Sequence, residues 1–243
     1  MTDTDADLVW ERQAKWWQDT FSNGADAEYV EQILPLVAEH LTGSSRVLDL
    51  GTGEGQIARL ASRHGADLSV GVDRSNAQIE EAFARGEALF VQADIAGLPF
   101  DDASFEGVVA TLVLEHITEV EPVLDEVRRV LVPGGRFLFL LNHPLLQTPG
   151  SGWIDDHILN EQYWRIGPYL SIDTTMEEVE AGILIPFVHR PLSHYINAMA
   201  ERGLLITRMI EPAPPPGFLA QANEYKDAAT IPRLLFIRAE RTF

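Results

Sequence analysis

The stretch that decides the fold is Arg46-Val47-Leu48-Asp49-Leu50-Gly51-Thr52-Gly53-Glu54-Gly55. Its first five residues form a short, mostly apolar run that stops at a glycine, which is typical of a buried β-strand. The glycines that follow let the backbone of a strand-to-helix turn approach a ligand closely. The stretch therefore predicts a strand that leads directly into a ligand-binding turn.

Strands and helices alternate with short connections on both sides of this turn. The apolar spacing predicts a helix over 25–41 and then, in order, strands over 46–50, 68–72, 88–92, 107–112 and 136–141, with helices over 56–64, 75–85 and 119–131 between them. This alternation is typical of a parallel sheet with helices on both faces. We therefore predict a doubly wound, mostly parallel α/β fold of the Rossmann-like type, whose ligands bind beyond the carboxyl ends of the strands.

The alternation stops after Asn142. Between Asp155 and Glu180 the chain carries seven acidic residues and one basic residue, with several aromatic residues nearby. A segment this long predicts a lid over the site, and its aromatic residues form either the core of the lid or a substrate cage. A helix over 191–202 and strands over 204–210 and 233–239 follow, with an extended proline-rich connection at 211–217.

Composition excludes several classes of function. The chain has 243 residues, which fits one domain, and its formal charge of −19 disfavours nucleic acid and anionic membrane surfaces as partners. No cysteine is present, so disulfides, thiolate nucleophiles and cysteine-bound metals are excluded. His189 and His194 are five residues apart, which does not match a metal-binding helical pair, and we expect no metal. The acidic N-terminus lacks the features of a signal peptide, so we expect a cytoplasmic protein.

Carboxylates stand at three consecutive predicted strand ends. Asp49 lies inside the first strand end, Asp73 ends the second, and Asp94 follows the third. Asp73 is placed to accept both hydroxyls of a ribose, and Asp94 to accept from an adenine amino group. The set indicates a nucleoside that carries positive charge. Asp73 would also suit a nicotinamide cofactor, although Gln56 stands where that fingerprint requires glycine.

At these residues the sequence resembles the class I S-adenosylmethionine-dependent methyltransferases of the small-molecule kind, related to quinone-biosynthesis methyltransferases. The resemblance covers about 45–141 and is carried, in the family's order and spacing, by Val47–Gly55, Val70–Arg74, Gln92–Asp94, Leu98–Phe105 and Arg129–Gly135. It implies a seven-stranded sheet with a reversed last strand and a helical or loop cap.

The resemblance also implies the cofactor contacts. Asp49, Gly51 and Gly53 would line its methionine and ribose side, and Asp73 would bind the ribose hydroxyls. The full implied set, which includes the adenine side and the end of the fourth strand, is Asp49, Gly51, Thr52, Gly53, Asp73, Arg74, Asp94, Ile95, Thr111 and Leu112.

Methyl transfer from a sulfonium asks chiefly for alignment and exclusion of water. A general base is needed only for an acceptor of high pKa. The histidines near predicted strand ends or the insert are the candidates, namely His116, His143 and His189, with His194 as a further one. Each also fits an ordinary interior histidine with satisfied hydrogen bonds.

We therefore expect a single domain, 1–243, that moves a methyl group from S-adenosyl-L-methionine to a small molecule and releases S-adenosyl-L-homocysteine. Within it we expect cap helices over 1–41, a cofactor core over 45–141, a substrate-side lid over 142–203 and closing strands over 204–243. The acidic lid favours a neutral or cationic acceptor. A nicotinamide-dependent oxidoreductase and a non-catalytic nucleoside-binding or regulatory protein remain as alternatives, and a homodimer stays open.

Overall fold

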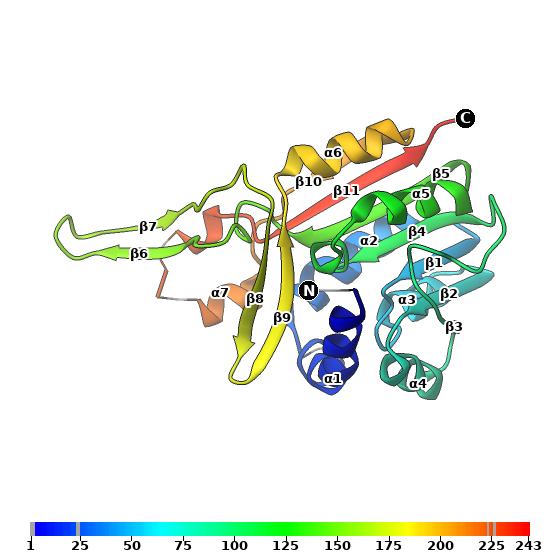
Figure 1. Ribbon diagram of the computed structural model, residues 1–243, viewed down its shortest axis with the longest axis horizontal. Helices are drawn as coiled ribbons and strands as arrows, with labels where there is room; N and C mark the ends of the chain where they lie inside the picture. Colours follow the sequence, from blue (N-terminus) through cyan, green and yellow to red (C-terminus); the bar gives the residue numbers. More distant parts are fainter. Residues whose placement is uncertain (1–2, 23–24, 223, 226) are drawn as a thin grey trace.

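The computed structural model describes residues 3–22, 25–222, 224–225 and 227–243. Within these residues a seven-stranded sheet has the order β10-β11-β5-β4-β1-β2-β3 (Figure 1). Its strands are β1 (Arg46–Leu50), β2 (Leu68–Asp73), β3 (Leu89–Gln92), β4 (Phe105–Thr111), β5 (Leu131–Asn142), β10 (Leu204–Ile210) and β11 (Leu234–Arg241).

The direction of the strands confirms the predicted topology. Strand β1 runs parallel to β2 and β4, with Leu48 opposite Val70 and Val108, and the parallel pairing continues to β3 and β5. Strand β11 is antiparallel to both β5 and β10, which is the expected reversed last strand. The order changes direction between β1 and β4, so a crevice is expected at their carboxyl ends.

Helices cover both faces of the sheet. Helices α2 (Leu34–Leu41) and α3 (Gln56–Arg63) pack on one face, and α4 (Asn76–Arg85) packs beside α3 over β3. Helices α5 (Val120–Val130) and α6 (Leu192–Glu201) bury apolar residues on the other face. None of the described helices is both long and apolar enough to cross a membrane.

The N-terminal segment differs from a single helix over 25–41. Helix α1 (Asp3–Phe21) precedes it and contacts α4, while the later helix begins as a short π-helix, η1 (Tyr29–Ile33), that continues into α2. Residues 1–2 and 23–24 of the expected cap lie outside the described residues. Tyr29 and Ile33 are buried against the sheet, which explains why apolar spacing detected this segment.

The lid consists largely of two β-hairpins, where the sequence suggested helices and loops. Strands β6 (Gly152–Asp156) and β7 (Glu161–Arg165) form a hairpin that projects from the body, and β8 (Asp173–Glu180) and β9 (Ile183–His189) form another (Figure 1). The proline-rich connection predicted over 211–217 is extended only as far as Pro215. Helix α7 (Pro216–Gln221) begins at the next residue, since proline is well suited to the first position of a helix.

Candidate functional site

The turn between β1 and α3 forms one wall of the site. Gly51, Gly53 and Gly55 have φ angles of 61°, 54° and 93°. These left-handed conformations are costly for residues that carry a Cβ. A Cβ on Gly51 would lie 2.5 Å from a methyl carbon of Val113, so only glycine fits there. The turn therefore brings bare backbone to the carboxyl edge of the sheet.

An open pocket lies at this edge, beyond β1, β2 and β4. It encloses about 90 Å³, or about 730 Å³ when its open mouth is included. Its walls are Trp10, Trp17, Gly51, Gly53, Asp73, Arg74, Gln78, Ala93, Asp94, Ile95, Thr111, Leu112, Val113, His116 and Ile117. The topology predicts a ligand site at this position.

All predicted cofactor contacts line this pocket except Asp49 and Thr52. Asp49 is 2% exposed and lies behind the turn, where its carboxylate accepts hydrogen bonds from the Thr52 hydroxyl and from the Ala58 N–H. Burial raises the pKa of Asp49 to about 7. Both side chains therefore support the turn from inside the core, and their direct contact with a cofactor stays a prediction.

Asp73 joins the turn to the pocket. One carboxylate oxygen accepts from the Gly53 N–H and the other from the Ser75 N–H, each at 2.9 Å. Burial raises the pKa of Asp73, while these two bonds oppose the shift. Across the pocket, Asp94 lies 3.8 Å from the guanidinium of Arg74. These carboxylates are placed to accept hydroxyl and amino donors of a nucleoside.

Helix α1 covers the pocket. The sequence predicted a helical cap in this region but did not show which of its residues line the pocket. Trp10 and Trp17 both line it, and their spacing of two helical turns places them on one face. A Cβ atom added to Gly53 would lie 3.4 Å from Nε1 of Trp17. The Glu11 carboxylate accepts from the Ser75 hydroxyl at 2.6 Å, and Gln18 donates to Gln78 at 3.0 Å.

His116 is the predicted histidine that lines the pocket. Its Nδ1 lies 2.7 Å from the carbonyl oxygen of Pro186, so Nδ1 carries the proton and Nε2 is an acceptor in the neutral ring. Burial lowers the pKa of His116 to about 4. The rings of Trp10 and Phe187 pack against the imidazole at centroid distances of 4.8 and 4.6 Å. A fixed, neutral hydrogen-bond acceptor results.

The other candidate histidines are not among the pocket residues. His143 Nε2 lies 2.9 Å from the Glu211 carboxylate, and His189 Nε2 lies 2.8 Å from the carbonyl oxygen of Tyr169. His194 forms an ion pair with Glu121 at 3.0 Å. These contacts place His143 and His189 outside the pocket lining, and a base at either position stays a prediction. In the described part of the chain, no cluster of three acidic or histidine side chains suits a metal.

Comparisons with known proteins now bear on this pocket. A family model described as a methyltransferase domain matches residues 48–139. The 2-phytyl-1,4-naphtoquinone methyltransferase of Trichormus variabilis is 30% identical over 181 residues, which are 65% of this chain and 78% of that protein. The crystal structure of an S-adenosylmethionine dependent methyltransferase from Mesorhizobium loti matches with a TM-score of 0.75 and 28% identity, over 85% of this chain and 96% of that one.

The chain belongs to the class I S-adenosylmethionine-dependent methyltransferases. The demethylmenaquinone methyltransferase of Thermotoga maritima is also similar, at 34% identity over 121 residues, 49% of this chain and 52% of that protein. The chain thus matches about half the length of this curated relative. The region that the family model matches, residues 48–139, begins in β1 and contains the glycine turn and all three strand-end aspartates.

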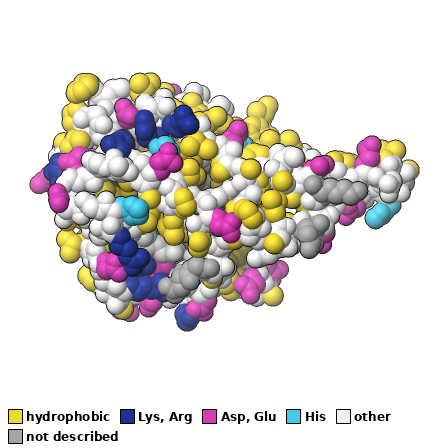
Figure 2. All heavy atoms as spheres, turned by 180° about the vertical axis from the view of Figure 1, so that it is seen from behind, with side chains coloured by type: hydrophobic (Ala, Val, Ile, Leu, Met, Phe, Trp, Pro, Cys, Tyr) yellow, Lys and Arg dark blue, Asp and Glu magenta, His cyan; other side chains and the backbone are white. Residues whose placement is uncertain are grey.

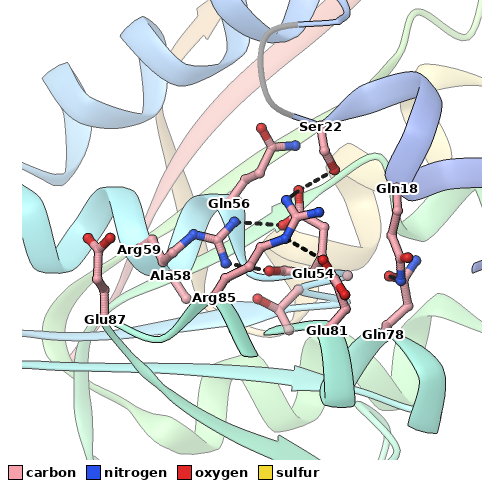
Figure 3. A network of polar contacts seen from close by, with 12 residues as sticks. Gln18, Ser22, Glu54, Gln56, Ala58, Arg59, Gln78, Glu81, Arg85 and Glu87 are labelled. Carbon is pink, nitrogen blue, oxygen red and sulfur yellow. Dashed lines mark hydrogen bonds and ion pairs between the residues drawn. The ribbon is translucent and has the colours of Figure 1, made fainter. Parts of the chain in front are cut away.

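In this member of the family, a buried charge network holds the glycine turn (Figure 3). Glu54 is 1% exposed, and its carboxylate pairs with Arg59 at 2.8 Å and with Arg85 at 3.2 Å. The Ser22 hydroxyl, just after α1, also donates to Glu54. The network therefore joins the cap, the turn, α3 and α4. The only signal in the sequence is an acidic residue between glycines, which does not identify its partners.

Proposed function

We propose that this protein transfers a methyl group from S-adenosyl-L-methionine to a small-molecule acceptor by in-line displacement, with S-adenosyl-L-homocysteine as the second product. The observation that carries the proposal is the pocket at the β1–β4 switch point, where bare glycine backbone, Asp73 and Asp94 meet under two tryptophans. Family membership supports the same donor.

The residues present fit this donor. A Cβ on Gly51 would clash with Val113, so the turn leaves space that a side chain would fill. The Thr111 hydroxyl lines the same pocket and is buried without a hydrogen-bond partner among the described residues, which leaves it available to a ligand. We propose that Asp73 accepts the ribose hydroxyls, that Asp94 accepts the adenine amino group, and that Thr111 faces the methionine portion.

Chemically, the donor supplies an already activated sulfonium methyl, and the chain supplies alignment and a dry site. Trp10 and Trp17 line the pocket and shield part of it from water, while the carboxylates suit a positively charged ligand. We propose that His116 Nε2 accepts a hydrogen bond from the nucleophilic O–H or N–H of the acceptor and so orients it. With a pKa of about 4, the imidazole stays neutral near pH 7 and does not repel the sulfonium.

The acceptor proposed here is neutral or cationic. The support is electrostatic: the chain carries a formal charge of −19, and the strands of the lid nearest α1 carry Glu177, Glu178 and Glu180. A phosphorylated acceptor would approach against this field. Two similar proteins are named for methylation of naphthoquinone-type compounds, so hydroxylated bicyclic aromatics are reasonable members of a first acceptor library.

The test is a library assay that detects S-adenosyl-L-homocysteine release, run in parallel with calorimetry of S-adenosyl-L-homocysteine. We expect binding, turnover of neutral compounds, and loss of turnover without loss of donor binding in His116→Ala. Tight donor binding without turnover of any compound would favour a regulatory protein. Preferential binding of a nicotinamide dinucleotide would contradict the proposal, and a preference for phosphorylated compounds would refute the charge argument.

A further inference from the structure

A second cavity lies at the base of the β6–β7 hairpin, outside the donor pocket. Its volume is about 260 Å³, and none of its lining residues lines the donor pocket. The walls come from the loop after β5, from β6 and β7, and from the β10–β11 connection, including Trp153, Trp164, Phe218, Tyr225 and Arg233. Figure 2 shows apolar side chains gathered where the hairpin joins the body.

Four aromatic rings form part of the wall. Trp153 and Trp164 are directly opposite each other in the hairpin, so they share one face, and their rings meet edge to face with centroids 5.6 Å apart. Tyr225 stacks on Trp153 at 4.9 Å with an angle of 5° between the rings. Fixed rings of this kind favour flat, apolar partners.

The positive charge of Arg233, which lines the cavity, is balanced by a nearby carboxylate. Its guanidinium lies 4.0 Å from the centroid of the Phe218 ring and donates to both carboxylate oxygens of Glu28, at 2.7 and 3.1 Å. Glu224 also lines the cavity. A cavity with a paired arginine and an additional carboxylate does not favour an anion. A neutral occupant fits this arrangement.

One polar atom of the wall has no partner. The indole Nε1 of Trp164 is buried and finds no hydrogen-bond acceptor among the residues that the structure describes. A buried donor left unpaired is costly, and such groups in native proteins call for an explanation. The Trp164 side chain is part of the cavity wall, so a turn of its ring toward the cavity would bring this N–H to an oxygen atom of a bound molecule.

The cavity has about 260 Å³ between its walls and about 690 Å³ with its open mouth, and the smaller volume indicates the part of an occupant that the walls enclose. An apolar cavity of about 150 Å³ holds benzene. About 260 Å³ therefore suits two fused rings. We propose that this cavity is a second binding site, which takes a flat, neutral, two-ring molecule whose carbonyl oxygen accepts the Trp164 indole N–H.

The site is separate from the donor pocket. Arg233 directly precedes β11, and β11 is two strands away from β4, where Thr111 and Leu112 line the donor pocket. With strands about 4.8 Å apart, this places the two sites roughly 10 Å apart along the sheet edge. Both sites can then be filled at once, and binding at one does not require the other to be empty.

A matched pair of ligands tests the proposal. Coumarin has two fused rings and a carbonyl oxygen, whereas naphthalene has the same shape without an acceptor. We expect the full chain, saturated with S-adenosyl-L-homocysteine, to bind coumarin more tightly than naphthalene in equilibrium dialysis. Trp164→Phe should weaken coumarin about fivefold more than it weakens naphthalene, because both lose ring contact and only coumarin loses a hydrogen bond. Trp16→Phe, which removes an indole N–H outside the cavity, should bind both as the wild type does.

A second variant covers a folding defect in the first. Ala222→Leu places added bulk in the cavity wall and should weaken both ligands. The proposal is overturned if the wild type binds neither ligand, if Trp164→Phe binds coumarin as tightly as the wild type, or if S-adenosyl-L-homocysteine displaces coumarin. Calorimetry of S-adenosyl-L-homocysteine alone tests the donor site independently, so failure of the two proposals is distinguishable.

Discussion

Replacement of Asp73 by alanine tests the donor site most directly. The carboxylate holds the Gly53 and Ser75 N–H groups at 2.9 Å and also lines the pocket. Hydrogen bonds to a charged group contribute about 1.5–3 kcal/mol each. Loss of even one bond to a ribose hydroxyl therefore corresponds to about a tenfold weaker dissociation constant, since tenfold is about 1.4 kcal/mol. We expect Asp73→Ala to weaken donor-site ligands at least tenfold.

The backbone bonds complicate a single measurement, because Asp73→Ala also releases the turn at Gly53. Calorimetry with adenosine and 2′,3′-dideoxyadenosine separates the two effects, since only adenosine carries the hydroxyls. We expect a large loss for adenosine and little change for the dideoxy compound. Asp73→Asn, which keeps the shape but loses the charge, should fall between wild type and Asp73→Ala.

Two results would refute the reasoning. Equal weakening of both nucleosides would mean that Asp73 acts only through the turn and does not bind the ribose. An unchanged dissociation constant for adenosine in Asp73→Ala would remove the ribose assignment altogether. Circular dichroism of each variant must match wild type for either conclusion to stand.

Three further predictions concern the turn and its surroundings. Gly53→Val should reduce S-adenosyl-L-homocysteine binding more than about tenfold in calorimetry with an unchanged circular dichroism spectrum, because the side chain would meet Trp17 and block the pocket; retained binding would contradict the geometry. Glu54→Gln removes the counter-charge of the buried Arg59, while Arg85 keeps its ion pair with Glu81; the change costs about 3–5 kcal/mol and lowers the melting temperature by about 6–20 °C. Glu87→Gln, at an exposed ion pair, is the control and should melt as the wild type does; equal melting of both variants would show that the Glu54 network is not stabilising. Burial raises the pKa of Glu115 from 4.5 to about 7. Between these two pH values the folded chain keeps a proton on Glu115 that the unfolded chain releases, so proton binding stabilises the fold at low pH and this contribution is lost as pH rises through 7. Glu115→Gln should therefore gain stability relative to wild type between pH 5 and pH 8, by up to about 3 kcal/mol in urea unfolding, and a difference independent of pH would exclude the shifted carboxyl.

Much of the sheet was predictable because strands such as β1 and β2 are short apolar runs that stop at Gly51 and at Asp73. The strand over 46–50 has the predicted bounds, and so does 204–210. The hairpins of the lid were not predictable from this rule. Strand β7, Glu161–Arg165, has exposed and half-buried residues in alternation and no apolar run, and it is stabilised by pairing with β6.

The residues of the candidate site were also predictable only in part. Strand-end aspartates were predictable because parallel strands bring their carboxyl ends to one edge. The roles of the histidines were not, since residue type does not show which neighbour lies nearby: His143 meets Glu211, which is 68 residues away in the chain. Glu54 likewise depends on Arg85 from another helix. Contacts of this range require the folded chain.

Helix α1 has a consequence for the pace of the reaction cycle. Beneath it the pocket has about 90 Å³ between its walls and about 730 Å³ with its open mouth, so an outward movement of α1 would enlarge the part that the walls enclose. Polar bonds from Glu11 and Gln18 hold this helix, and water can replace them. We therefore expect the rate at which spent donor leaves the pocket to depend on how readily these bonds break.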